Sequence, residues 1–178
     1  MYEPAEDSYL LKETTKQHCK KNKIKSSLDI GTGTGIIAEE LAKHSEKVVA
    51  IELDLDTIKK IKNKLNKKIK LIHSDLFENI PKQKFDVITF NPPYLPKGDY
   101  PEDKELTSGK TGLNTTIKFL KQAKEYLSKN GTILFIASSH AEIELLEKTM
   151  KKLKYGFKEL KKQHIFFEDI MVYEAKLI

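Results

Sequence analysis

Short apolar segments alternate with longer amphipathic ones along most of the chain. The apolar segments are rich in Val, Ile and Leu and have the length of buried strands, whereas the longer segments carry apolar residues at helical spacing. Predicted strands lie at residues 27–30, 47–53, 69–73, 85–90, 132–137, 158–167 and 170–177. Predicted helices lie at about 5–21 and at 35–44, 54–66, 114–128 and 141–153.

This alternation predicts an α/β fold, because parallel neighbours in a sheet need a helical crossover between them. The last two strands are joined by a connection too short for a crossover, so they must form an antiparallel hairpin. The pattern therefore predicts a Rossmann-like, mostly parallel seven-stranded sheet with a C-terminal antiparallel hairpin. A chain of 178 residues has enough apolar residues for one core, so we expect a single domain over residues 1–178.

Composition narrows the range of partners only slightly. The 32 basic residues are all lysine, and against 26 acidic residues they give a net charge of +6, which suits RNA or an acidic partner but is also an ordinary solubility feature. The lack of arginine disfavours base reading in a DNA major groove. A single cysteine and histidines without ligand spacing predict neither a disulfide nor a metal site. With no membrane-spanning apolar run and no secretory pattern, we expect a soluble cytoplasmic protein.

A glycine-rich turn, Gly-Thr-Gly-Thr-Gly at residues 31–35, follows the first predicted strand. Ligands of doubly wound sheets bind at the carboxyl ends of the strands, and glycines there let the backbone approach the ligand closely. Gly31 and Gly33 are therefore candidate cofactor-binding residues. Ile36 stands where the nicotinamide-type GxGxxG would have its last glycine, which disfavours a dinucleotide.

Carboxylates at the ends of the first three predicted strands sharpen this expectation. Glu52 lies about 20 residues beyond the glycine turn, where an acid can accept hydrogen bonds from both ribose hydroxyls. Asp29 would repel a pyrophosphate but suits an ammonium, and Asp75 could accept the adenine amino group while Leu76 packs on the ring. S-adenosylmethionine has an ammonium and a ribose but no phosphate, so we predict it as the cofactor. The alternative is that these acids are ordinary polar residues at strand ends.

Asn-Pro-Pro-Tyr at residues 91–94 ends the fourth predicted strand. Two prolines remove two backbone donors and fix two φ angles, so they predict a rigid turn. The side-chain oxygen of Asn91 and the backbone oxygen of Pro92 could accept both hydrogens of a planar NH2 group, on which Tyr94 could stack. Holding these hydrogens would favour attack of the nitrogen on a sulfonium methyl group, with in-line placement supplying most of the remaining rate. The alternative is a proline-capped strand with a surface tyrosine.

Together these stretches resemble the HemK-type (PrmC-type) methyltransferases, which methylate the glutamine side-chain amide of translation termination factors. The resemblance covers essentially the whole chain. It includes Glu-Pro-Ala-Glu-Asp-Ser at 3–8, the glycine turn, Ser-Asp-Leu at 74–76, Asn-Pro-Pro-Tyr and Ser-Gly-Lys-Thr-Gly at 108–112. The opening stretch resembles the short archaeal and eukaryotic branch, whereas Asn-Pro-Pro-Tyr is shared with adenine methyltransferases of DNA and RNA.

The resemblance implies a class I methyltransferase fold and an S-adenosylmethionine-dependent protein-(glutamine) N-methyltransferase. It implies that the residues which bind the cofactor or bridge it to the substrate are Ser8, Asp29, Gly31, Glu52, Asp75, Leu76 and Asn91. It also implies a heterodimer in which a small zinc-binding activator subunit extends the sheet at the edge near 69–73. One departure is Ser108-Gly109, where the family tends to show two glycines. We expect the long loop at 95–113 to be a mobile substrate lid.

Two other functions stay open from the sequence. An adenine-amino methyltransferase would use the same NH2-accepting turn, but the lack of a target-recognition domain and of arginine makes nucleic acid an unfavourable substrate. A non-catalytic cofactor-binding scaffold subunit is the other alternative, against which the intact Asn91 and Tyr94 argue.

Overall fold

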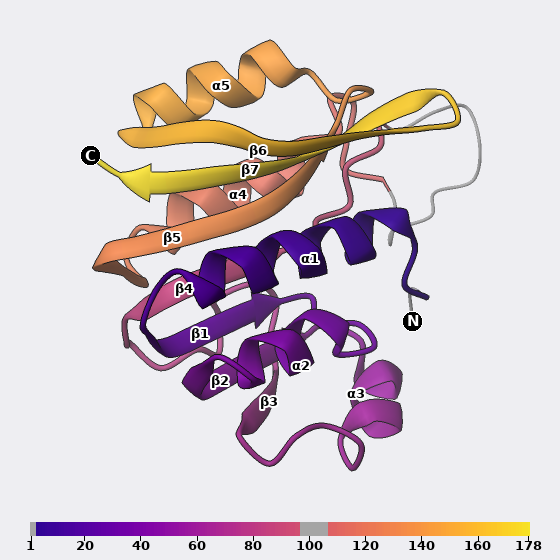
Figure 1. Ribbon diagram of the computed structural model, residues 1–178. Coiled ribbons are helices and arrows are strands. Elements are labelled where there is room, and N and C mark those ends of the chain that lie inside the picture. The colour runs from indigo at the N-terminus through magenta and orange to yellow at the C-terminus, as the bar shows by residue number, and fades with distance from the viewer. Residues whose placement is uncertain (1–2, 97–106) are drawn as a thin grey trace.

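The structure, a computed structural model, describes residues 3–96 and 107–178. Part of the expected lid at 95–113 therefore lies outside the described residues. The described strands form one seven-stranded sheet in the order β3-β2-β1-β4-β5-β7-β6 (Figure 1). Their bounds are β1 Ile24–Ile30, β2 Ser45–Glu52, β3 Ile69–His73, β4 Phe85–Phe90, β5 Leu127–Ser138, β6 Tyr155–Ile165 and β7 Glu168–Leu177.

The first five strands run parallel, and β7 is antiparallel to both β5 and β6. The predicted fold class is thus confirmed. The chain order reverses between β1 and β4, which makes the end of β1 the switch point at which such sheets bind ligands. Ile30, the last residue of β1, is paired with Ile51 on one side and Phe90 on the other. The segments that follow β1 and β4, together with the end of β2, therefore meet at one edge of the sheet.

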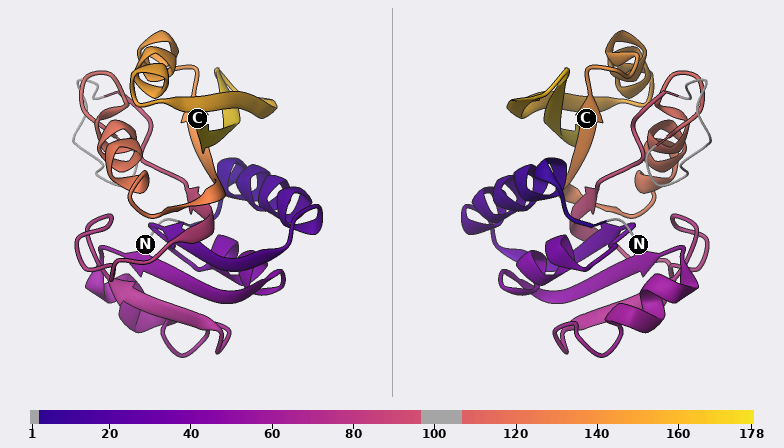
Figure 2. Two further views of the ribbon diagram at one scale, coloured as in Figure 1. Left: turned by 90° about the vertical axis from the view of Figure 1, so that its left-hand side faces the viewer. Right: turned by 90° about the vertical axis from the view of Figure 1, so that its right-hand side faces the viewer.

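Helices cover both faces of the sheet (Figure 2). Apolar residues of α1 and α2 pack in one core cluster, and those of α4 and α5 pack in the other. The short α3 contacts β2 and β3. The bounds are α1 Glu6–Lys20, α2 Ile36–Ala42, α3 Leu55–Ile61, α4 Asn114–Ala123 and α5 Ile143–Lys152.

The N-terminal helix α1 lies antiparallel to β1, so its first turn comes to the carboxyl-end edge of the sheet (Figure 1). It rests on α2 and on β5, β6 and β7, strands from the far end of the chain. The imidazole of His18, near the end of α1, lies 3.5 Å from the carboxylate of Glu174 on β7, and both side chains are nearly buried. Burial lowers the pKa of His18, with the Glu174 charge acting in the opposite direction.

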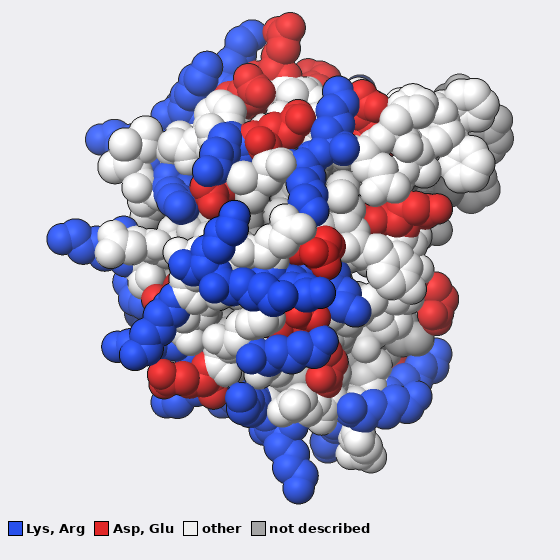
Figure 3. Space-filling view, viewed as in Figure 1, with Lys and Arg blue, Asp and Glu red and all other residues white. Residues whose placement is uncertain are grey.

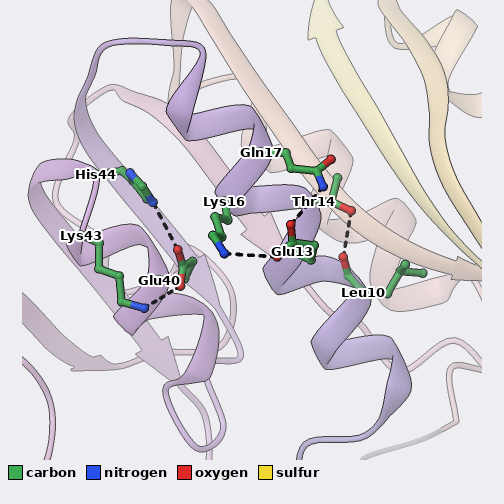
Figure 4. Close-up of polar contacts among 8 residues, drawn as sticks. All are labelled: Leu10, Glu13, Thr14, Lys16, Gln17, Glu40, Lys43 and His44. Atoms are coloured by element: carbon green, nitrogen blue, oxygen red, sulfur yellow. Dashed lines mark hydrogen bonds and ion pairs between the residues drawn. The ribbon is translucent and has the colours of Figure 1, made fainter.

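Several polar groups of α1 and of the segment 40–44 at the end of α2 form local contacts (Figure 4). The buried Thr14 donates its hydroxyl to the carbonyl oxygen of Leu10 at 2.8 Å. The buried carboxylate of Glu40 accepts a hydrogen bond from Lys43 at 2.8 Å and lies 3.2 Å from His44. These bonds satisfy Thr14 and Glu40, whereas the buried hydroxyl of Thr15 in α1 has no partner among the described residues.

The prediction that a helix fills 114–128 is wrong at its end. The helix ends at Ala123, and β5 begins at Leu127, which pairs with Phe85 of β4. The backbone N–H of Phe85 donates to the carbonyl oxygen of Tyr126 at 2.8 Å. Pairing with β4 has therefore overridden a local pattern that suits a helix, as tertiary contacts often do.

Lysines spread over much of the face seen in Figure 3, with acidic side chains interspersed. This mixture of charges fits the interpretation of the net charge as an ordinary solubility feature. In the part of the chain that the structure describes, no helix combines the length and the apolar character that crossing a bilayer requires.

Candidate active site

A cavity of about 440 Å³ opens at the switch point of the sheet. The first turn of α1, the glycine turn after β1, the end of β2 and the turn after β4 all contribute to its wall. Of the residues predicted to form the site, those that line it are Ser8, Asp29, Gly31, Gly33, Glu52, Asn91, Pro92 and Tyr94. Asp75 and Leu76 are not part of its wall. The fold thus gathers most of the predicted residues from four separate segments.

The glycine turn keeps its backbone open toward the cavity. Gly31, Gly33 and Gly35 all have positive φ angles, of 61°, 53° and 86°, which L side chains rarely adopt. A Cβ atom added at Gly35 would also lie 2.4 Å from Leu65. These positions need glycine, and the bare backbone leaves room for a ligand to approach.

Glu52 stands at the rim of the cavity with its carboxylate held in place. One oxygen accepts from the Gly33 N–H at 2.9 Å, and the other from the N–H groups of Leu53 at 2.8 Å and Asp54 at 3.0 Å. A carboxylate has about four acceptor positions and three are used here, so about one is left for a ribose hydroxyl. The bond to Gly33 ties the predicted ribose acceptor directly to the glycine turn.

Asp29 is buried beneath the same turn. Its two oxygens accept hydroxyl hydrogens from Thr32 at 2.7 Å and Thr89 at 2.8 Å. Burial raises the pKa of Asp29 to about 6, against these hydrogen bonds, which act to lower it. A negative charge is thus costly here, and a cationic group in the cavity would offset part of that cost.

The Asn-Pro-Pro-Tyr turn is held by a residue that the sequence reasoning did not assign to the site. The Asn91 side-chain N–H2 donates to Oδ2 of Asp7 at 2.9 Å, and the Tyr94 hydroxyl donates to the same oxygen at 3.2 Å. Asp7, in the first turn of α1, is 3% exposed. Its place in the Glu-Pro-Ala-Glu-Asp-Ser stretch was a signal, but an acid at the start of a helix is also favoured by the helix dipole alone.

The other amide atom of Asn91, a residue of the cavity wall, has no partner in the described part of the chain. This atom, Oδ1, is buried. Each buried polar atom left unsatisfied costs about 1–3 kcal/mol, and such atoms concentrate where a ligand will supply the missing bond. An N–H donor at this position would satisfy it.

The segment that follows the long loop supports the turn from outside. Leu95 forms a bridge with Thr107 and accepts from the Ser108 N–H at 2.9 Å. The Ser108 hydroxyl in turn accepts from the Thr115 N–H at 2.8 Å, in the first turn of α4. Ser108, which stands where the family tends to show a glycine, thus connects the Asn-Pro-Pro-Tyr turn to α4.

Asp75 and Leu76 follow β3, away from the wall of the cavity. Asp75 pairs with Lys118 of α4 at 2.9 Å, and both side chains are about half exposed. Leu76 is buried and has a positive φ of 49°. Their proposed contacts with an adenine therefore stay predictions.

These features fit S-adenosylmethionine. The exposed surface of the cavity is mostly apolar, which suits the methylene groups and the adenine of this cofactor, and Glu52 and Asp29 provide acceptors for hydroxyl and ammonium groups. No group of three His, Cys, Asp or Glu side chains suited to a metal ion occurs within residues 3–96 and 107–178.

Comparison with known proteins agrees with this description. The family model of the methyltransferase small domain matches residues 7–166. A Methanocaldococcus jannaschii protein provisionally assigned to the protein N5-glutamine methyltransferases is 37% identical over 98% of this chain and 91% of its own. The release factor glutamine methyltransferase of Borreliella burgdorferi is 35% identical over 89% of this chain, which spans 59% of that longer protein.

A tRNA1(Val) (adenine(37)-N6)-methyltransferase of Haemophilus influenzae is also related, at 32% identity over 75% of this chain and 60% of its own. Among solved structures, the E. cuniculi Mtq2–Trm112 complex, described as responsible for methylation of the eRF1 translation termination factor, contains a similar chain. The TM-score is 0.80, with 25% identity, and the match covers 99% of this chain and 98% of that one. The predicted resemblance is confirmed, and the chain belongs to the methyltransferase small domain family.

Proposed function

We propose that the protein transfers a methyl group from S-adenosylmethionine to the side-chain amide nitrogen of a glutamine in a peptide chain release factor. One observation carries the acceptor chemistry: Asn91 lines the cofactor-sized cavity, and its buried Oδ1 has no partner among the described residues. The named activities of the M. jannaschii, B. burgdorferi and E. cuniculi proteins support glutamine in a termination factor as the target.

In this proposal the glycine turn and the strand ends hold the cofactor. Glu52 accepts from the ribose at its remaining acceptor position, Asp29 contributes negative charge toward the ammonium, and Ser8 lies against the cofactor from α1. Asp75 and Leu76 are proposed for the adenine. The bound cofactor supplies a sulfonium-activated methyl group.

The Asn-Pro-Pro-Tyr turn holds the nitrogen that receives this group. Asn91 Oδ1 and the Pro92 carbonyl oxygen accept the two amide hydrogens, which favours pyramidalisation of a nitrogen whose lone pair is otherwise delocalised. Tyr94 packs against the plane of the amide. The chain thus acts by orienting the acceptor, and in-line placement supplies most of the rate. The nitrogen loses one proton after transfer, so the product is again a neutral amide.

The partner proposed for the sheet edge is a small zinc-binding activator subunit. β3 is an edge strand in which Ile69, Leu71 and Ile72 are half-buried. An exposed edge with apolar side chains favours pairing with another chain. The two-chain assembly named for the E. cuniculi structure supports a small partner. Zinc binding by that partner and a cytoplasmic location are further parts of the proposal.

The deciding experiment is methyl transfer from labelled S-adenosylmethionine. The chain, alone and with its partner subunit, is incubated with a purified release factor, and mass spectrometry locates the label. We expect one methyl group on a glutamine, and none on a factor in which that glutamine is replaced by alanine. Cofactor binding without transfer to any substrate would contradict the proposal and favour a scaffold.

An adenine-amino methyltransferase is the second candidate, favoured by the H. influenzae relative. An exocyclic amino group and a glutamine amide present the same planar NH2 to Asn91, so the turn does not distinguish them. Parallel reactions with tRNA and DNA separate the two. Label in nucleic acid, with none in the release factor, would overturn the glutamine proposal.

A further inference from the structure

The orientation of the Asn91 amide is set by a carboxylate from the other end of the chain. A side-chain amide can turn over, which exchanges an oxygen that accepts for an N–H2 that donates. In this structure Nδ2 faces Asp7 at 2.9 Å, and Oδ1 is the buried atom without a partner in the described part of the chain. Because a carboxylate only accepts, turning the amide over would lose this bond and bring two oxygens together.

Asp7 is itself held firmly. Its Oδ1 accepts from both the backbone N–H and the hydroxyl of Ser8, and its Oδ2 also accepts from the Tyr94 hydroxyl. The side chain is 3% exposed and lies in the first turn of α1, where the helix dipole favours negative charge. A group with this many donors has one orientation available, and so does the amide that it binds.

We infer that Asp7 is a positioning residue which makes the site select an amide over a carboxylate, that is, glutamine over glutamate. The inference rests on the proposed function. With Nδ2 bonded to Asp7, Oδ1 is the amide atom of Asn91 left to accept from the substrate, as the Pro92 carbonyl does, so the target must bring two N–H donors. A glutamate side chain would bring two negative oxygens to two acceptors and would be excluded before any chemistry.

The test replaces Asp7 with asparagine, which has nearly the same shape but can also donate. Asn91 can then adopt both orientations, so Asp7→Asn should lower kcat for the glutamine target by about 10–100-fold and leave cofactor affinity nearly unchanged. A peptide carrying glutamate at the target position, used as an inhibitor, should bind the variant about tenfold more tightly than the parent. Glu6→Gln is the matched control, because it removes the same charge from an exposed neighbour in the same helical turn.

The reciprocal exchange sharpens the test. In Asp7→Asn/Asn91→Asp the amide introduced on α1 can donate to the carboxylate introduced in the turn, whose second oxygen again faces the substrate as an acceptor. The double variant should recover glutamine transfer at least tenfold over either single variant and should again reject the glutamate peptide. A residue that only stabilises α1 would show no such recovery.

Two outcomes would overturn the inference. One is an Asp7→Asn variant with parental glutamine transfer, even if it binds the glutamate peptide better, because loss of charge alone would explain that result. The other is an NMR result with S-adenosylhomocysteine bound: the side-chain N–H2 signals of Asn91 would be the same in Asp7→Asn as in the parent. This second measurement needs no substrate, so it decides the orientation even if the parent methylates no release factor and the proposed function fails.

Discussion

Gly112 packs directly on the carbonyl oxygen of Tyr94. A Cβ atom at Gly112 would lie 2.3 Å from that oxygen, and the φ angle of Gly112 is +71°. The glycine at the end of the Ser-Gly-Lys-Thr-Gly stretch is therefore a support for the Asn-Pro-Pro-Tyr turn.

Gly112→Ala should displace this turn. We expect the free energy of unfolding to fall by about 1–3 kcal/mol because a non-glycine residue is strained at positive φ, and methyl transfer to fall further than stability does. Urea unfolding and a transfer assay measure the two effects. Gly156→Ala is the control, since a Cβ atom there would be no closer than 3.7 Å to other atoms. Equal losses in both variants would contradict a specific role for Gly112.

Asn91→Ala should separate binding from chemistry. Removing Oδ1 takes away an acceptor for the substrate nitrogen, so we expect transfer to fall on the order of 10²-fold or more while cofactor affinity is largely kept. Calorimetry with S-adenosylhomocysteine and a transfer assay are the measurements, and the exposed Asn130→Ala is the control. Transfer at the parental rate would mean that the turn does not hold the acceptor nitrogen.

Asp29 should make stability depend on pH. Its pKa is raised by burial to about 6 from 3.8, so folding favours the protonated form. The stabilising contribution is complete below the unfolded pKa and is lost as pH rises through about 6. Asp29→Asn removes this pH-dependent contribution to the free energy of unfolding. Its free energy of unfolding, relative to the parent, should therefore rise on the order of 3 kcal/mol between pH 4 and pH 7.

Chemical unfolding of both proteins across this range tests the prediction. The difference between variant and parent is the quantity to compare, because other carboxyls of the chain, such as Asp169, have lowered pKa values and act in the opposite direction. A difference that does not change with pH would show that Asp29 is not the group responsible.

Asp75 and Lys118 test the proposed adenine contact. If Asp75 accepts the adenine amino group, Asp75→Ala should weaken cofactor binding by about tenfold, since a lost hydrogen bond costs about 1 kcal/mol or more. Lys118→Met breaks the pair between them but leaves the carboxylate, and a half-exposed pair contributes only about 0–1 kcal/mol. Similar losses in both variants would indicate that Asp75 serves to hold α4.

The strand pattern of the sequence predicted the fold well because buried parallel strands are nearly continuous apolar runs. β4 at Phe85–Phe90 and β3 at Ile69–His73 match their predicted ranges fully. The residues near Leu127 were predicted as helix but form a strand. Pairing with β4 decides their structure, and the local sequence pattern holds no information about that partner.

The same reason explains what was missed in the site. Residues at strand ends, such as Glu52 and Asn91, could be assigned from position alone, because parallel strands share one carboxyl edge. Asp7 precedes Asn91 by 84 positions and comes from a helix outside the βαβ pattern. Only the packing of α1 brings the two together, and no spacing rule predicts it.

The contacts of α1 with later strands link the position of Asp7 to the order in which the chain is synthesised. The helix that carries Asp7 rests on β5, β6 and β7, and its far end meets Glu174. Asp7 and His18 are 11 helical steps apart, about 17 Å along a rigid helix, so a contact with β7 helps to fix the depth at which Asp7 meets Asn91. A nascent chain that has emerged only as far as α4 already contains every described residue of the cavity wall, but its α1 contacts α2 and lacks the support of β5, β6 and β7. The rate of methyl transfer should therefore rise to its full value only after β7 has left the ribosome.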